Sequence, residues 1–167
     1  RTILFIGFAG EEFGLLGAQA WVKAHKDKLP KIANLFNRDG GPEPPVGISV
    51  PQAMYDDFVK ISEPIQKIRP DYPFEVKVRE PRKRPTRMGG TDASVFAIEG
   101  VPTLGFTTED FKGYDFDYGE IWHTERDLYT KNIPEYQEHT ATVTAIIALV
   151  VANLDKQLSR EGLYTEE

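Results

Sequence analysis

The chain has 167 residues, of which 40% are hydrophobic and 28% charged, with a net charge of −6 and no cysteine. This composition suits one soluble domain with a sizeable core, and the acidic balance argues against a nucleic-acid-binding protein, which needs a basic surface. The lack of cysteine excludes disulfides, thiolate nucleophiles and cysteine-ligated metals, so any metal would be held by His, Asp and Glu.

The chain begins at Arg1, without a methionine and one residue before an apolar run, so we expect it to be a segment of a longer protein. No repeat or linker divides it, and residues 1–167 are expected to form a single, partial catalytic domain. The longest apolar run, residues 143–152, is too short to cross a bilayer. The sequence therefore predicts no transmembrane segment.

Five strands are predicted, at residues 2–8, 32–37, 46–50, 74–79 and 101–106. The first two are almost wholly apolar, as central strands covered on both faces are. The fourth alternates apolar and charged side chains, which indicates a half-exposed edge strand.

Helical periodicity occupies residues 13–25, 53–69, 92–98 and 134–158. Helices that alternate with strands favour an α/β fold. We expect a three-layer domain in which helices flank a mostly parallel mixed sheet.

A basic stretch, "EPRKRPTRMGG" at residues 80–90, separates the fourth strand from the third helix. Its basic side chains would suit a clamp for an acidic ligand or a substrate carboxylate. A solvated, mobile loop is the interpretation that we favour, because charge runs are usually solvated.

Polar residues with catalytic potential follow the predicted strands. Glu11 and Glu12 come after the first strand, Asp39 after the second, Asp92 opens the third helix, and His123 precedes the last. Because α/β sheets build their sites at the carboxyl ends of strands, these side chains are expected to converge. Carboxylates and an imidazole suit zinc, whose positive charge would compensate the adjacent glutamates.

Each residue also has a simpler explanation. Glu11 and Glu12 suit the first turn of a helix through its macrodipole, and Asp39 before two glycines suits a turn. Asp92 fits a helix N-cap, and a lone histidine such as His123 is usually a packing residue. The combination favours a site, since these independent explanations would have to coincide.

The two remaining histidines, His25 and His139, lie on polar helix ends and are expected in solvent.

Four blocks in order resemble the zinc-dependent aminopeptidases of the M28 type: "RTILFIGFAGEEFGLLGAQAWV", "NRDGG", "GGTDASVFAIEGVPTLGF" and "WHTERD". The resemblance covers residues 1–155 and is specific because of the order of the blocks. It implies that Glu11 is the general base, which takes a proton from metal-activated water and passes it to the leaving amine. It further implies that Glu12 and His123 bind one zinc and that Asp39 binds a second.

The resemblance also marks departures from the family pattern. The family's site needs a histidine and a bridging aspartate from upstream of the first strand, so this segment is expected to be inactive alone. Trp122 stands where many relatives have a tyrosine that stabilises the oxyanion, and indole offers only an N–H donor. Trp122 and Asp92 are therefore assigned to substrate binding.

The predicted substrates are peptide or protein N-termini, and family resemblance favours a secreted or periplasmic location. One alternative is a glutaminyl-cyclase-like enzyme with a single zinc. Another is a metal-free binding module on the same fold. Asp39 followed by two glycines, together with "GLLGAQAWV", favours the peptidase.

Overall fold

The computed structural model describes residues 1–165. Its elements, in chain order, are α1 (Leu16–Ala24), η1 (Lys26–Lys31), β1 (Pro45–Val50), α2 (Gln52–Ile68), β2 (Glu75–Val78), α3 (Ala93–Ile98), β3 (Phe106–Thr108), α4 (Tyr118–Ile121), η2 (Tyr129–Lys131) and α5 (Pro134–Asn153). No helix in this range combines the length and apolarity that crossing a membrane requires.

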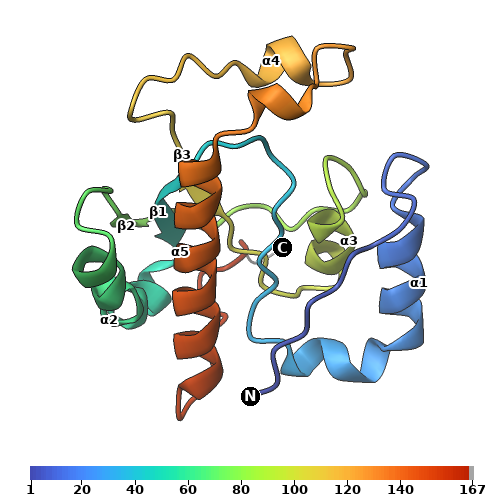
Figure 1. Ribbon diagram of the computed structural model, residues 1–167. Helices are drawn as coiled ribbons and strands as arrows, with labels where there is room; N and C mark the ends of the chain where they lie inside the picture. The colour runs from blue at the N-terminus through green and yellow to red at the C-terminus, as the bar shows by residue number, and fades with distance from the viewer. Residues whose placement is uncertain (166–167) are drawn as a thin grey trace.

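The three strands form one mixed sheet in the order β2-β1-β3 (Figure 1). β1 is parallel to β2, with Gly47 opposite Glu75, and antiparallel to β3, with Ile48 opposite Phe106. Three of the four residues of β2 are exposed, which confirms the predicted edge strand. The predicted α/β class, a mixed sheet flanked by helices, is confirmed.

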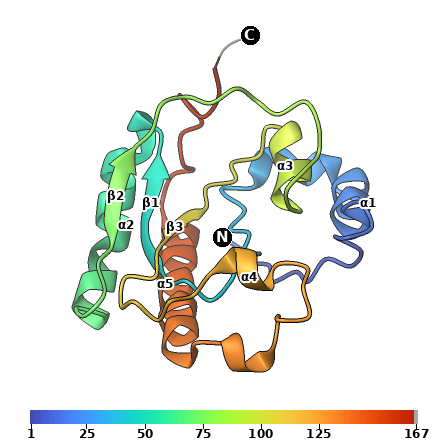
Figure 2. The ribbon, with the colours of Figure 1, turned by 90° about the horizontal axis from the view of Figure 1, so that it is seen from above.

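Two apolar clusters hold the elements together. The larger joins the sheet to α2 and α5 through the fully buried side chains of Ile48, Phe58, Val143 and Ile147. The smaller packs α1 against α3 and includes Ala18 and Phe96, among others. In both views α1 and α3 lie beside each other, across the molecule from α2 (Figure 2). The candidate site is lined mostly by residues of the loops that connect the helices and strands.

The prediction of a strand at residues 2–8 is wrong. Among the described residues this segment is extended, but it pairs with no other strand. Residues 1–7 are exposed, and the side chain of Phe5 is 94% exposed. Within residues 1–165, the backbone of residues 2–8 makes no hydrogen bond to a neighbouring strand. An apolar run becomes a strand only when a partner takes up its N–H and C=O groups.

The second and fifth predicted strands are also shorter or absent. Residues 32–37 form no strand: Leu35 donates one backbone hydrogen bond to the carbonyl of Pro102, but the N–H and C=O of Leu104 bond to the Asn34 side chain, which interrupts a backbone ladder. Of residues 101–106, only Phe106 belongs to β3. The last helix ends at Asn153, five residues before the predicted end at residue 158.

His139 is fully buried, so its predicted solvent exposure is wrong. Its imidazole stacks on Tyr72 with ring centroids 3.8 Å apart, and its Nε2 lies 3.0 Å from the carbonyl oxygen of Pro45. Burial lowers the pKa of His139, so the neutral ring is favoured. His25, by contrast, is half-buried and stacks on Trp21.

Tyr136 on α5 anchors the loop that leads towards α4. Its hydroxyl donates to Asp110 Oδ1 at 2.6 Å and accepts from the backbone N–H of Lys112 at 3.0 Å. Desolvation raises the pKa of Asp110, but the hydrogen bonds from Tyr136 and from backbone amides outweigh it, so the pKa lies below its ordinary value.

We expect Tyr136→Phe to destabilise the fold by about 1–2 kcal/mol, because a buried hydroxyl that bonds a carboxylate is lost. The lowered pKa means that Asp110 contributes its stability above the unfolded-state pKa of about 3.9 and loses it as the pH falls through the folded-state value. The variant should therefore lose less stability on acidification than the wild type. Urea unfolding of both proteins at pH 6 and pH 3 measures this difference, and equal losses would contradict it.

Candidate active site

Glu11 and Glu12 lie on a tight turn between the extended N-terminal segment and α1. The N–H groups of Gly14 and Leu15 donate to the carbonyl of Glu11, at 2.9 and 2.8 Å. Gly14 has a φ of 101°, a conformation that residues with a side chain rarely adopt. The turn therefore favours glycine at position 14, and Glu11 and Glu12 both precede the first residue of α1.

Gly17 sets the position of this turn against α1. Its N–H donates to the carbonyl of Ala9 at 2.8 Å, and a Cβ on Gly17 would lie 2.7 Å from both the nitrogen and the oxygen of Ala9. These are backbone atoms, which cannot move aside cheaply. The close approach of the two chain segments therefore depends on glycine.

We expect Gly17→Ala to destabilise the protein by about 1–2 kcal/mol, since overpacking of about 1–3 kcal/mol outweighs the gain of about 1 kcal/mol in helix propensity. It should also displace Glu11 and Glu12. Gly7→Ala is the matched control, because a Cβ at Gly7 has no heavy atom within 4 Å. Urea unfolding of the two variants tests the expectation, which fails if Gly17→Ala is as stable as the control.

Asp39 lies on a loop that Arg38 holds in place. The Arg38 guanidinium donates to the carbonyls of Gly41 and of Glu43, the latter at 2.7 Å. A Cβ on Gly41 would overlap the ring of Phe116, so the loop passes directly beneath that ring. Desolvation lowers the pKa of Arg38, although the nearby Glu43 acts in the opposite direction.

His123 follows α4 and adopts a left-handed backbone conformation, with a φ of 56°. Such a conformation costs a non-glycine residue about 1–3 kcal/mol and persists only where the surroundings enforce it. Here the N–H of Trp122 donates to Tyr118 and that of Thr124 donates to Ile121, at 2.9 and 3.0 Å. Strained backbone of this kind is typical of functional sites.

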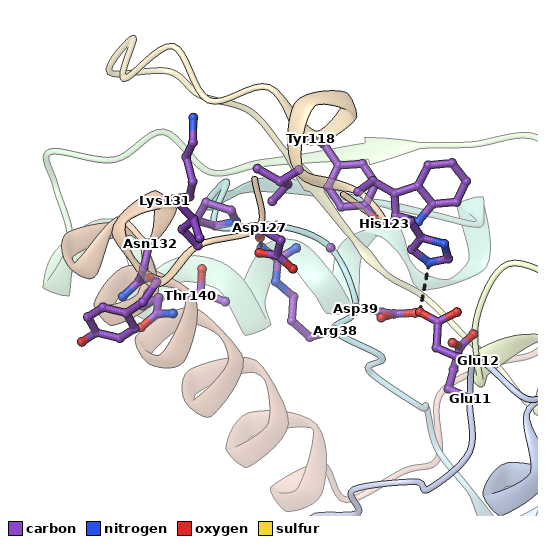
Figure 3. A pocket seen from close by; sticks show the side chains of 18 of the residues that line it. Glu11, Glu12, Arg38, Asp39, Tyr118, His123, Asp127, Lys131, Asn132 and Thr140 are labelled. Atoms are coloured by element: carbon purple, nitrogen blue, oxygen red, sulfur yellow. Dashed lines mark hydrogen bonds and ion pairs between the residues drawn. The ribbon is translucent and has the colours of Figure 1, made fainter. Parts of the chain in front are cut away.

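The structure brings Glu12 and His123 together from positions 111 residues apart, with 3.0 Å between Oε1 and Nε2. Glu11, Asp39 and Trp122 line the same cavity of about 910 Å³. Figure 3 shows Glu11, Glu12, Asp39 and His123 at one end. The other end is lined by polar side chains, including Lys131, Asn132 and Thr140.

The acidic end of the cavity concentrates negative charge. Desolvation raises the pKa of Glu11, and the nearby carboxylates of Glu12, Asp39 and Asp92 raise it further, while His123 lowers it. Carboxylates this close repel one another unless a cation compensates them. The arrangement therefore favours a bound positive charge.

Asp92 is near enough to Glu11 and Asp39 to affect the pKa of Glu11, and it is only 9% exposed. Desolvation raises its pKa, with a further contribution from Asp39. Its carboxylate makes no capping hydrogen bond to α3, so the N-cap explanation is wrong, and Ala93 donates to Thr91 Oγ1 instead. In the part of the chain that the structure describes, Asp92 Oδ1 has no hydrogen-bond partner, and Asp92 is not among the residues that line the cavity.

The fit to zinc is partial. A carboxylate and an imidazole 3.0 Å apart are donors of the right chemistry for two positions of a tetrahedral zinc site. Across residues 1–165, however, no three His, Asp or Glu side chains are grouped closely enough to hold a metal ion. Asp39 and Glu11 are near but do not complete a site with this pair.

Several lining residues had no signal in the sequence, among them Arg38, Asn132 and Thr140. Only Arg38 stood beside a candidate residue. Asn132 comes from the segment before α5 and Thr140 from α5 itself, and their convergence is visible only in three dimensions.

The basic stretch at residues 80–90 is partly fixed to the domain rather than free. Arg84 donates twice to the carbonyl of Ile98 at the end of α3, and Arg82 donates to Thr103 Oγ1 at 2.9 Å. Cations at a helix C-terminus stabilise it through the macrodipole. These contacts give two of the basic side chains structural roles.

The model of peptidase family M28 matches residues 1–148. Carboxypeptidase Q is 24% identical over 165 residues in both Mus musculus and Xenopus laevis, with 96% of this chain and 31% of each relative covered. A crystal structure of a peptidase M28 precursor from Shewanella amazonensis superposes with a TM-score of 0.66 at 25% identity, over 91% of this chain and 31% of that one. The chain thus spans less than a third of the length of these relatives.

Proposed function

Because the chain belongs to peptidase family M28, we propose that it is part of the catalytic domain of a zinc-dependent aminopeptidase. The observation that carries the proposal is the contact between Glu12 and His123, with Glu11 beside it and Asp39 on the same cavity. The predicted catalytic and metal-binding residues occupy one end of this cavity.

In this proposal each side chain has one role. Glu12 and His123 hold one zinc and Asp39 a second, and further ligands come from a segment outside residues 1–167. Zinc, when bound, polarises the scissile carbonyl and lowers the pKa of a water. Glu11 takes a proton from the attacking water and gives it to the leaving amine, because its carboxylate is adjacent to the metal-binding residues and free of the helix. Trp122, which lines the cavity, is assigned to substrate binding, whereas Asp92 is buried and does not line the cavity, so the substrate-binding role expected for it is not proposed.

An aminopeptidase is the activity that the resemblance of the four sequence blocks implies. The charge of the cavity does not decide between the two peptide termini, because zinc bound to Glu12, His123 and Asp39 would compensate the carboxylates. Two of the relatives are named carboxypeptidases, so the choice of terminus needs a direct test.

The test uses a longer, active form of the protein and three versions of one short peptide, with free ends, an acetylated N-terminus, and an amidated C-terminus. An aminopeptidase cleaves the free and amidated peptides and spares the acetylated one. A carboxypeptidase would instead cleave the acetylated peptide and spare the amidated one. Formation of pyroglutamate from an N-terminal glutamine peptide would show a cyclase.

The 167-residue chain alone is proposed to be a poor catalyst, because its described residues group no complete metal site. Robust turnover of a chromogenic aminoacyl substrate by this chain with added zinc would contradict that. The secreted or periplasmic location stays a prediction, which cell fractionation of the tagged protein tests.

A further inference from the structure

The segment that carries His123 is stabilised by internal hydrogen bonds from side chains that do not line the cavity. Asp117 accepts from the N–H of Gly119 at 2.8 Å and so caps α4. Thr124 Oγ1 donates to the carbonyl of Glu120 at 2.7 Å, one residue after the left-handed turn at His123. Both bonds are local to residues 117–124 and do not join the turn to another part of the molecule.

Glu120 joins this turn to the segment before α5. Its Oε2 lies 2.9 Å from Lys131 Nζ, and its Oε1 lies 3.5 Å from Arg126 Nη1. The Glu120 and Lys131 side chains are 34% and 38% exposed, so the ion pair is partly shielded from solvent. The hydrogen bond from Lys131 lowers the pKa of Glu120 and keeps its carboxylate charged at neutral pH.

We propose that Glu120 is a positioning residue: through Lys131 it holds the 117–131 loop in the form that presents His123 to Glu12. Glu120 is not among the cavity-lining residues, so it acts through the backbone rather than on a substrate. The left-handed backbone of His123 is a conformation that the surroundings must enforce, and the ion pair spans that turn from one side to the other. The proposal rests on the proposed function, in which His123 and Glu12 bind the same ion.

The test compares Glu120→Gln with Glu125→Gln in the 167-residue chain. Glu125 is exposed, lies two residues from His123, and forms no hydrogen bond or ion pair within the described residues, so it is a matched control. Imidazole ¹H–¹⁵N correlation spectra and nuclear Overhauser effects report the His123–Glu12 contact, and the buried His139 reports the fold. Calorimetric titration with zinc chloride reports affinity.

We expect Glu120→Gln to remove the His123–Glu12 contact, to leave the His139 signals unchanged, and to weaken zinc binding by about 10- to 100-fold. The charge swap Glu120→Lys with Lys131→Glu should restore the contact. Spectra and affinity for Glu120→Gln that equal those of the control would overturn the proposal.

Two further outcomes separate this proposal from the proposed function. If the wild type binds no zinc, the metal-binding role fails on this chain, and the His123–Glu12 contact still decides whether Glu120 positions His123. If Glu120→Gln also shifts the His139 signals, the charge swap decides: recovery of the contact supports the proposal, and a folded swap without it overturns the proposal.

Discussion

Alanine at either Glu12 or His123 is expected to abolish zinc binding by the 167-residue chain, because each residue supplies one of the two ligands that are in contact among the described residues. The two side chains already lie at hydrogen-bonding distance, so part of the geometry exists before a metal enters. Protons compete with metal ions for imidazole and carboxylate ligands, so calorimetry at neutral or slightly basic pH is the appropriate measurement.

His25→Ala is the matched control for this prediction. His25 stacks on Trp21 and lies apart from the cavity-lining residues, so its loss should leave zinc affinity unchanged. Zinc that binds equally to the wild type and to both site variants would show that the ion is held elsewhere. If the wild type binds none, the pair needs further ligands before it forms a site.

The helices were predictable because their signal is local. The apolar periodicity of α2 and α5 involves residues that are close in the sequence. Most of the predicted ends of these two helices lie close to the observed ends. β2 was equally readable from its alternation. Elements of this kind need no knowledge of distant partners.

Strand pairing depends on residues that are distant in the sequence, and this explains why some of the predicted strands are not formed. Residues 2–8 carry the most apolar strand pattern in the chain, yet they form no strand, because no segment among the described residues pairs with them. The Asn34 side chain, rather than a strand backbone, bonds the N–H and C=O of Leu104, and hydrophobic periodicity in the sequence does not reveal such a contact. The burial of His139 likewise comes from Tyr72, 67 positions earlier in the sequence.

The candidate site was predictable only in part. The convergence of Glu11, Glu12, Asp39 and His123 was expected from strand ends, but their separate roles came from the family resemblance. Asn132 and Thr140 needed the fold, since nothing near them in sequence indicates a cavity. Local patterns therefore found the charged end of the cavity and missed the polar end.

Glu11→Gln is expected to reduce kcat by roughly 10²- to 10⁴-fold in a longer, active form of the protein while zinc affinity stays near the wild-type value. Glutamine keeps the size and shape of the side chain but cannot accept a proton. Glu12, one residue away, is the contact partner of His123, so the two neighbouring glutamates should separate cleanly into a base and a ligand.

The distinction between these roles is measurable because the two variants fail differently. Glu12→Ala should lose zinc and activity together, whereas Glu11→Gln should bind zinc and lose only kcat, with KM little changed. A Glu11→Gln enzyme with kcat within a few-fold of the wild type would remove Glu11 as the base. Loss of zinc binding in Glu11→Gln would instead make Glu11 a ligand, and the explanation of the adjacent glutamates would have to be reversed.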